Sequence, residues 1–170
     1  MDTRHSVIDT RLGEITMTAR DTGLTGLYFE GHKYLPGADA YGERVDAAAD
    51  PLLAQAVREL DEYLRGERRM FGVPVATSGD VFSERVWEML RAIPFGETTT
   101  YGALATRLGD RHLAQAVGQA VGHNPVSIVI PCHRVVGADG SLTGYAGGLD
   151  RKRWLLDHEE PAEASAARLF

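Results

Sequence analysis

The sequence predicts an α+β protein built in two successive parts, a small antiparallel sheet with one helix followed by a mostly helical region. Three observations support this prediction. Apolar and polar residues alternate from residue 5 to residue 29, as is typical of strands. Apolar residues then recur at helical spacing from residue 51 to residue 64, and beyond residue 80 the pattern is helical. We expect one part to span residues 1–79 and the other residues 80–170.

The first part begins with short strand-like runs separated by turn residues. Gly13 and the run Asp21-Thr22-Gly23 interrupt the alternation, so residues 5–29 are expected to form strands joined by tight turns. Residues 31–50 carry few large apolar side chains and are interpreted as a connecting loop.

A helix start follows this loop. Asp50 is a typical N-cap, and Pro51 fits the first helical position, so a helix is predicted to run to Gly66 and to pack on the sheet. Residues 71–75 then predict a short strand or an extended arm, and residues 77–80 are the expected linker.

The second part is predicted to begin and end with helices. Asp80 is a plausible cap for an apolar helical stripe that stops at Pro94. A last helix is expected over residues 149–159, with Leu155 and Leu156 pointing inward. The tail from Glu160 onward is acidic and rich in alanine, and we expect it to be loosely held.

Two short helices lie between these two. Thr100 can cap the first, which Gly109 closes, and the second runs from about residue 113 to residue 121 before Gly122. Two short helices joined by a tight turn have the shape of a helix-turn-helix. By itself this spacing is weak evidence for DNA binding, because such pairs are also common packing units.

The chain contains a single cysteine, Cys132, directly after the apolar run of residues 126–130. Most single cysteines are small buried residues, but His133 can accept a proton and Arg134 adds positive charge, and both features favour a reactive thiolate. Neighbouring residues of an extended segment point to opposite sides. We therefore expect His133 to act on the sulfur through a bridging water rather than by direct contact.

Composition narrows the class of protein. A single cysteine allows no internal disulfide and no pair of thiolate ligands for zinc, which suits a reducing, cytoplasmic location. We see no ligand spacing for a metal and expect no cofactor. Residues 1–5 lead into no long apolar segment, and no stretch approaches the roughly 20 apolar residues of a membrane span, so neither secretion nor membrane insertion is expected.

The net charge of −6 argues against strong binding to nucleic acid, but its distribution matters more. Residues 1–79 hold nine Lys and Arg against thirteen Asp and Glu, whereas residues 80–156 hold eight against seven. The second part can therefore approach DNA with a modest set of basic groups.

Six short motifs resemble those of the O6-alkylguanine-DNA alkyltransferases: IPFGET (93–98), YGALA (101–105), AVG (116–118), NP (124–125), IPCHRV (130–135) and LTGYAGGL (142–149). The resemblance covers residues 81–159 almost without gaps, while the first eighty residues match only in general layout. It implies a ribonuclease-H-like N-terminal sheet with one long helix, and a C-terminal domain with a winged helix-turn-helix. It also implies a repair reaction in which an alkyl group on O6 of guanine in double-stranded DNA moves irreversibly to the protein's own cysteine.

The resemblance assigns roles to individual residues. Cys132 is the alkyl acceptor, His133 the general base acting through water, and Glu159 the carboxylate that orients the imidazole. Tyr101 would hydrogen-bond N3 of the guanine, and Asn124 would brace the turn beneath the cysteine. Each has an ordinary alternative, since without the family Glu159 reads as an exposed charge at a helix end, Tyr101 as a core tyrosine and Asn124 as a turn residue.

Further residues are expected around the substrate. The wall of the alkyl pocket would be formed by Tyr145, Ala146, Gly147, Gly148 and Val135. Because the target atom lies inside a stacked duplex, the nucleotide must be flipped out, and the family does this from the minor groove with the second helix of its helix-turn-helix. The expected DNA-binding residues are Thr100, Arg111, Ala114, Gln115, Ala116 and Gly118.

The sequence departs from the family at Gln115, where an arginine usually enters the base stack. Glutamine keeps hydrogen-bonding ability but lacks the charge and the planar fork, so we expect slower repair or weaker binding of duplex DNA, with Arg111 as a partial substitute. Two other functions remain open: a lesion-binding module that does not transfer the alkyl group, and a Cys-His hydrolase. Cys132 argues against the first, and no oxyanion hole is visible for the second. We expect a monomer in solution, with cooperative assembly on DNA left open.

Overall fold

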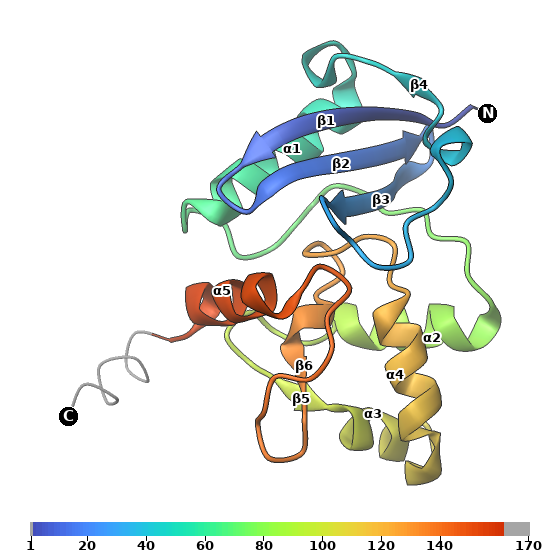
Figure 1. The fold of residues 1–170 in the computed structure, drawn as a ribbon, viewed down its shortest axis with the longest axis vertical. Helices are drawn as coiled ribbons and strands as arrows, with labels where there is room; N and C mark the ends of the chain where they lie inside the picture. Colours follow the sequence, from blue (N-terminus) through green and yellow to red (C-terminus); the bar gives the residue numbers. More distant parts are fainter. Residues whose placement is uncertain (1, 162–170) are drawn as a thin grey trace.

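The computed structural model describes residues 2–161 and places a sheet and one helix above a cluster of helices (Figure 1). The sheet has the order β3-β2-β1-β4 and contains β1 (Arg4–Thr10), β2 (Gly13–Arg20), β3 (Gly23–Phe29) and β4 (Glu43–Arg44). The first three strands are antiparallel, as predicted, and tight turns join them.

The fourth strand is a correction to the prediction. β4 pairs in parallel with β1, so the sheet is mixed, and β4 comes from the segment that was expected to be only a loop. Backbone and side-chain hydrogen bonds tie the segment to the sheet edge: Val45 N–H donates to His5, and the buried Ser6 hydroxyl donates to Val45 O at 2.6 Å. The spacing of apolar residues in the sequence cannot predict a strand that is held by such polar contacts. The same segment holds the 3-10 turns η1 (Ala38–Tyr41) and η2 (Ala47–Ala49).

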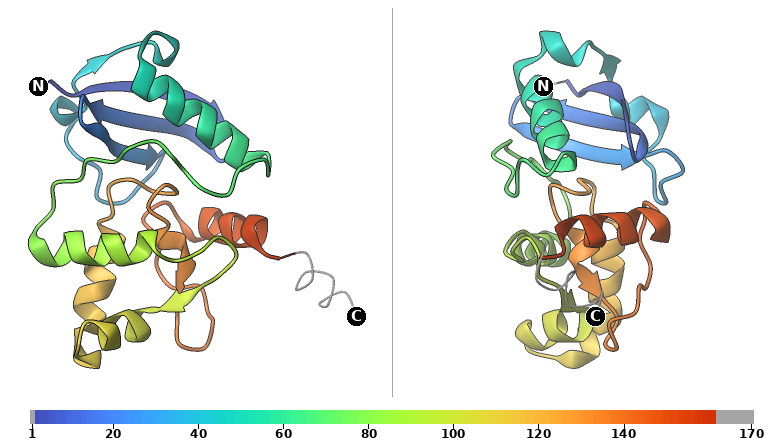
Figure 2. Two further views of the ribbon diagram at one scale, coloured as in Figure 1. Left: turned by 180° about the vertical axis from the view of Figure 1, so that it is seen from behind. Right: turned by 90° about the vertical axis from the view of Figure 1, so that its left-hand side faces the viewer.

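Helix α1 (Pro51–Leu64) covers one face of the sheet (Figure 2). Asp50 accepts hydrogen bonds from the backbone N–H groups of Leu52 and Leu53, which confirms the predicted N-cap. The helix buries a stripe that includes Leu53, Ala56, Leu60, Tyr63 and Leu64. This stripe places Tyr63 at the end of α1 that is nearest the second part of the chain, where it contacts His158.

An extended arm leads from α1 into the second part. Leu24 N–H donates to Pro74 O and Ala76 N–H donates to Leu24 O, so residues 74–76 run along β3 and form one isolated bridge rather than a strand. The apolar core is continuous across both parts. The division at residues 79 and 80 stays a prediction.

The second part contains α2 (Val81–Arg91), α3 (Tyr101–Arg107), α4 (Ala114–Gly122) and α5 (Leu149–Glu159). Asp80 caps α2 and Thr100 caps α3, as predicted. The 3-10 turn η3 (Arg111–Leu113) joins α3 to α4 and completes the helix-turn-helix. Trp87 on α2 donates its indole N–H to Ala120 O at 2.8 Å, which fixes α4 against α2. Strands β5 (Thr99–Thr100) and β6 (Val135–Val136) pair in parallel beside them.

The segment that carries the cysteine is not extended, which corrects the prediction. Ile128 has a φ of 71°, and Ile130 N–H donates to Val126 O in a turn. The 3-10 turn η4 (Cys132–Arg134) follows. With about three residues per turn, successive side chains point in three directions rather than two. The side chains of Cys132, His133 and Arg134 can therefore contact different parts of the protein.

No helix in residues 2–161 is long and apolar enough to cross a membrane. The predicted loose tail beyond residue 161 lies outside the described residues.

Candidate active site

Cys132 lies at the N-terminal end of η4, is 5% exposed, and is a free thiol. Burial raises the pKa of this thiol, and the Asn124 side chain and the charge of Lys152 only partly oppose that effect. The expectation that neighbouring charges favour the thiolate is therefore corrected, because the effect of burial outweighs theirs. The Arg134 guanidinium is not available to stabilise the sulfur, because it donates hydrogen bonds to Glu159 and to Ile93 O.

His133 points toward the end of α5, where its Nε2 lies 2.7 Å from Glu159 Oε2. Both side chains are buried, so Glu159 is not the exposed helix-end charge that its position allows. With Nε2–H donated to the carboxylate, Nδ1 is the free acceptor of the ring, and within residues 2–161 this buried atom has no hydrogen-bond partner. Burial also lowers the pKa of His133 and keeps the imidazole neutral.

Glu159 is the centre of a buried network. Arg134 donates to both carboxylate oxygens, at 2.7 and 3.0 Å, and the Tyr63 hydroxyl donates to Oε2 at 2.5 Å. Burial opposes the charge of Glu159, but the hydrogen bonds and charges of His133 and Arg134 outweigh it and lower the pKa of the carboxyl group to about 2. A permanent carboxylate therefore holds the imidazole in one tautomer.

Asn124 lies beneath the cysteine turn. Its amide Nδ2 donates to Ile130 O at 2.8 Å, and its Oδ1 accepts from Val126 N–H at 3.0 Å. The side chain is 2% exposed, so both bonds are shielded from water. Asn124 thus joins the two ends of the segment that delivers Cys132.

A pocket of about 710 Å³ opens onto Cys132 between α4 and the glycine-rich loop of residues 143–148. Half of the expected site residues line it, namely Cys132, Tyr101, Ala114, Gln115, Gly118, Tyr145, Ala146 and Gly148. Tyr101 receives a long hydrogen bond of 3.4 Å from the Thr143 hydroxyl, across the pocket. The Tyr145 hydroxyl is buried and has no hydrogen-bond partner within the described residues. The Tyr101 hydroxyl therefore faces the pocket, whereas the Tyr145 hydroxyl is buried in its wall.

Five of the residues expected to contact DNA or to form the alkyl-pocket wall lie outside the pocket lining. Thr100 serves as the cap of α3, and Val135 is fully buried in β6, where it pairs with Thr99. Gly147 faces the sheet, because a Cβ there would lie 2.5 Å from the Phe29 ring. Arg111 and Ala116 are exposed on the helix-turn-helix.

Lys33, Tyr34 and Lys152 are among the site residues that were not predicted from the sequence. Lys33 and Tyr34, from the loop after β3, line the pocket and bring the first part of the chain to its rim. Tyr34 stacks on His123 with ring centroids 3.9 Å apart. Lys152 is buried and donates from Nζ to Thr143 O at 2.7 Å and Gly144 O at 3.2 Å. Spacing could have revealed it, since residues 152, 155 and 159 share one face of α5.

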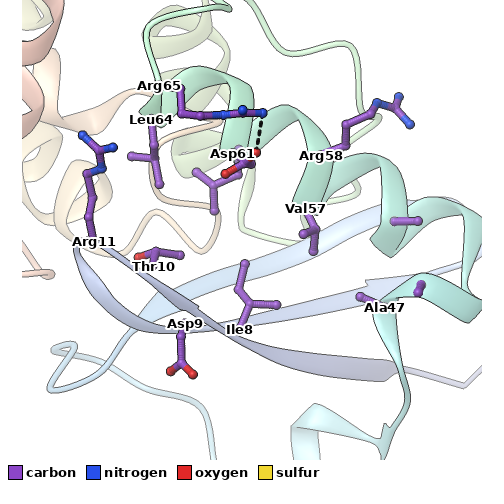
Figure 3. Close-up of a pocket in the computed structure, with 13 residues that line it drawn as sticks. Ile8, Asp9, Thr10, Arg11, Ala47, Val57, Arg58, Asp61, Leu64 and Arg65 are labelled. Carbon is purple, nitrogen blue, oxygen red and sulfur yellow. Dashed lines mark ion pairs between the residues drawn. The ribbon is translucent and has the colours of Figure 1, made fainter.

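A second groove, of about 770 Å³, lies between β1 and α1 (Figure 3). It has an apolar floor that includes Ile8 and Val57, and Arg58 and the Asp61–Arg65 ion pair lie on α1 at its side. It holds neither a thiol nor a histidine, so the candidate active site is the pocket at Cys132. Within residues 2–161 no cluster of His, Cys, Asp or Glu could hold a metal ion.

Comparison with known proteins covers nearly the whole chain. Residues 3–77 match the family model for the 6-O-methylguanine DNA methyltransferase, ribonuclease-like domain, and residues 81–161 match the model for its DNA binding domain. A methylated-DNA–protein-cysteine methyltransferase of Mycolicibacterium paratuberculosis is 42% identical over 166 residues, which cover 98% of each chain.

Solved structures agree with these matches. The crystal structure of the Mycobacterium tuberculosis O6-methylguanine methyltransferase is 38% identical with a TM-score of 0.82, covering 96% of this chain and 98% of that one. The M. tuberculosis OGT in complex with DNA is 41% identical with a TM-score of 0.84 over 92% of each chain. The sheet with α1 is thus the ribonuclease-like part and the helices are the DNA-binding part, and the chain belongs to the 6-O-methylguanine DNA methyltransferase family.

Proposed function

We propose that this protein repairs double-stranded DNA by moving the alkyl group of O6-alkylguanine irreversibly to Cys132. One observation supports the assignment to this residue. The only cysteine of the chain lines an open pocket, and its neighbour His133 is hydrogen-bonded to the buried carboxylate of Glu159. Each molecule acts once, because the product is a stable thioether.

The reaction begins with loss of the thiol proton. His133 Nδ1 is the free acceptor of the ring, and it takes this proton through a bridging water. Glu159 stabilises the imidazolium that forms, which explains why a carboxylate with a pKa of about 2 is useful there. Burial raises the pKa of Cys132, so removal of the thiol proton by His133 is a necessary step of the reaction.

The thiolate then attacks the alkyl carbon in line. The S–C bond forms as the C–O6 bond breaks, and the electron pair of that bond goes to the purine. Tyr101 donates its hydroxyl proton toward N3 and stabilises the departing purine, which regains a proton as guanine. A thiol and an O6-alkylguanine thus become an S-alkylcysteine and guanine, with no cofactor.

DNA reaches the site through α4. Ala114, Ala116 and Gly118 have little or no side chain, so the helix can lie close to a minor groove. Gln115 and Gly118 also line the pocket, which puts the groove-binding helix beside the space for a flipped base. The protein acts as a cytoplasmic monomer that makes few phosphate contacts, and Arg111 partly substitutes for the missing arginine of the family.

Intact-mass and peptide analysis tests this function directly. The protein is mixed with a duplex oligonucleotide that carries one O6-methylguanine, and with the same duplex carrying guanine as a control. The expected result is a single added methyl on the peptide with Cys132, saturating at one per protein and absent from Cys132→Ser. Lesion binding without a mass change would instead identify a recognition module, and repeated turnover of an ester would identify a hydrolase.

A further inference from the structure

The hydroxyl of Tyr63 joins the ribonuclease-like part to the catalytic carboxylate. Tyr63 lies on α1, is fully buried, and donates to Glu159 Oε2 at 2.5 Å across 96 residues of sequence. That oxygen is also the one that lies 2.7 Å from His133 Nε2. Arg134 Nη2 donates to the same oxygen at 3.0 Å, so Tyr63, His133 and Arg134 share one acceptor atom.

Several contacts fix the tyrosine in this position. Its ring packs against Phe71 and Phe95, with centroids 5.4 and 6.3 Å away. The backbone carbonyl of Tyr63 lies 2.6 Å from His158 Nε2 on α5, one residue before Glu159. Because α1 and α5 are tied at adjacent positions by backbone and side chain, movement of α1 would shift the carboxylate.

We propose that Tyr63 is a positioning residue for alkyl transfer, through which the ribonuclease-like part holds Glu159 in the geometry that orients His133. The inference rests on the proposed function, since it concerns the base of that reaction. It gives the first part of the chain a role in chemistry, in addition to its packing. Tyr63 itself does not line the pocket, so it acts only through Glu159.

The shared oxygen also makes the basicity of His133 depend on Tyr63. The charged and titratable groups that face His133 are Glu159 and Lys152 on α5 and Arg134 beside it in η4. A hydrogen bond from Tyr63 draws charge away from the carboxylate. Without that bond, more of the negative charge of Glu159 acts on the imidazole, and the acidic limb of the rate profile should move to higher pH.

The test measures single-turnover methyl transfer from the O6-methylguanine duplex at a series of pH values, by quenched mass analysis. The variants are Tyr63→Phe, Glu159→Gln and the double variant, with Leu53→Val as a control that perturbs the buried face of α1 away from Glu159. We expect Tyr63→Phe to slow transfer about tenfold near neutral pH. Its acidic limb should rise by roughly half a pH unit. Leu53→Val should lower only the unfolding midpoint.

The double variant separates positioning from general damage. If Tyr63 acts through the carboxylate, Tyr63→Phe slows transfer no further in the Glu159→Gln background. An equal slowing in both backgrounds, or a wild-type rate and pH profile for Tyr63→Phe, would overturn the proposal while leaving the proposed function intact. A wild-type protein that transfers no methyl group would instead refute the proposed function.

Discussion

Lys152 lies with its ammonium group beneath the glycine-rich loop, 2.7 Å from the carbonyl oxygen of Thr143. Burial lowers the pKa of Lys152 to about 8, although the nearby Cys132 opposes this shift. The residue therefore holds one wall of the pocket and also places a positive charge where a thiolate must form. One side chain therefore influences both the shape of the pocket and the charge near Cys132.

Replacement of this lysine should make the thiol less reactive. In Lys152→Met the side chain keeps much of its bulk but loses the charge that opposes the burial effect on Cys132. We expect the pKa of the thiol to rise and alkylation by iodoacetamide near pH 7.5 to slow about tenfold, as a one-unit shift implies. The rate is followed by peptide mass against pH. Lys33→Met, at the rim of the same pocket, is the control, and an identical curve for both variants would contradict the assignment.

Acid should destabilise the protein through Glu159. The pKa of this carboxyl group is about 2 when folded and about 4.5 when unfolded, so its contribution is complete above pH 4.5 and is lost as the pH falls toward 2. The shift corresponds to about 3 kcal/mol. Urea denaturation at several pH values between about 6 and 2 measures it. In Glu159→Gln the free energy of unfolding should fall less steeply over this pH range. An equally steep fall in the variant and the wild type would contradict the stabilising role of the Glu159 hydrogen bonds.

His32 should also make the protein less stable as the pH falls, but at a higher pH than Glu159 does. Burial, followed by the charge of Arg151, lowers its pKa to about 4. Because the unfolded chain binds a proton near pH 6.5 and the folded chain does not, the free energy of unfolding should fall as the pH drops from 6.5 to 4. His32→Gln should reduce this pH dependence of the unfolding free energy, leaving the parts due to the buried His133 and to Glu159, as measured by the same urea series.

Gln115→Arg should improve repair of duplex DNA. The side chain is exposed at the pocket, so a guanidinium there gains a planar fork and a charge for the base stack. We expect duplex affinity to rise about fivefold, while the reaction with free O6-benzylguanine stays unchanged. Gln119→Arg, one turn further along α4 and also on the pocket, is the matched control. Unchanged duplex binding and transfer for Gln115→Arg would exclude a role for the missing arginine.

Asn124→Ala should loosen the cysteine turn. It removes both bonds of the buried amide and leaves Ile130 O and Val126 N–H without their partner. We expect a loss of about 2–3 kcal/mol in the free energy of unfolding. Methyl transfer should also become slower. Ser6→Ala removes a buried hydrogen bond at the far edge of the sheet and should lower stability alone. If the two variants transferred equally fast, Asn124 would have no role beyond the fold.

Local sequence signals predicted the helices because their causes are local. Asp50, Asp80 and Thr100 cap the helices they precede, and each cap needs only residues two or three positions away. The signals failed at β4 and at Cys132. Strand β4 depends on hydrogen bonds to a distant edge, and the turn at Cys132 depends on a buried asparagine. An apolar run alone does not distinguish a strand from such a turn.

The sequence by itself determined the α+β class, the capped helices and the single thiol with a histidine beside it. Only the tertiary structure decided that Glu159 is buried, that Tyr63 and Arg134 share it with His133, and that Lys33, Tyr34 and Lys152 belong to the site. The reason is physical: capping and helical periodicity act over a few residues, whereas burial and charge pairing join atoms 25 to 96 residues apart once the core has formed.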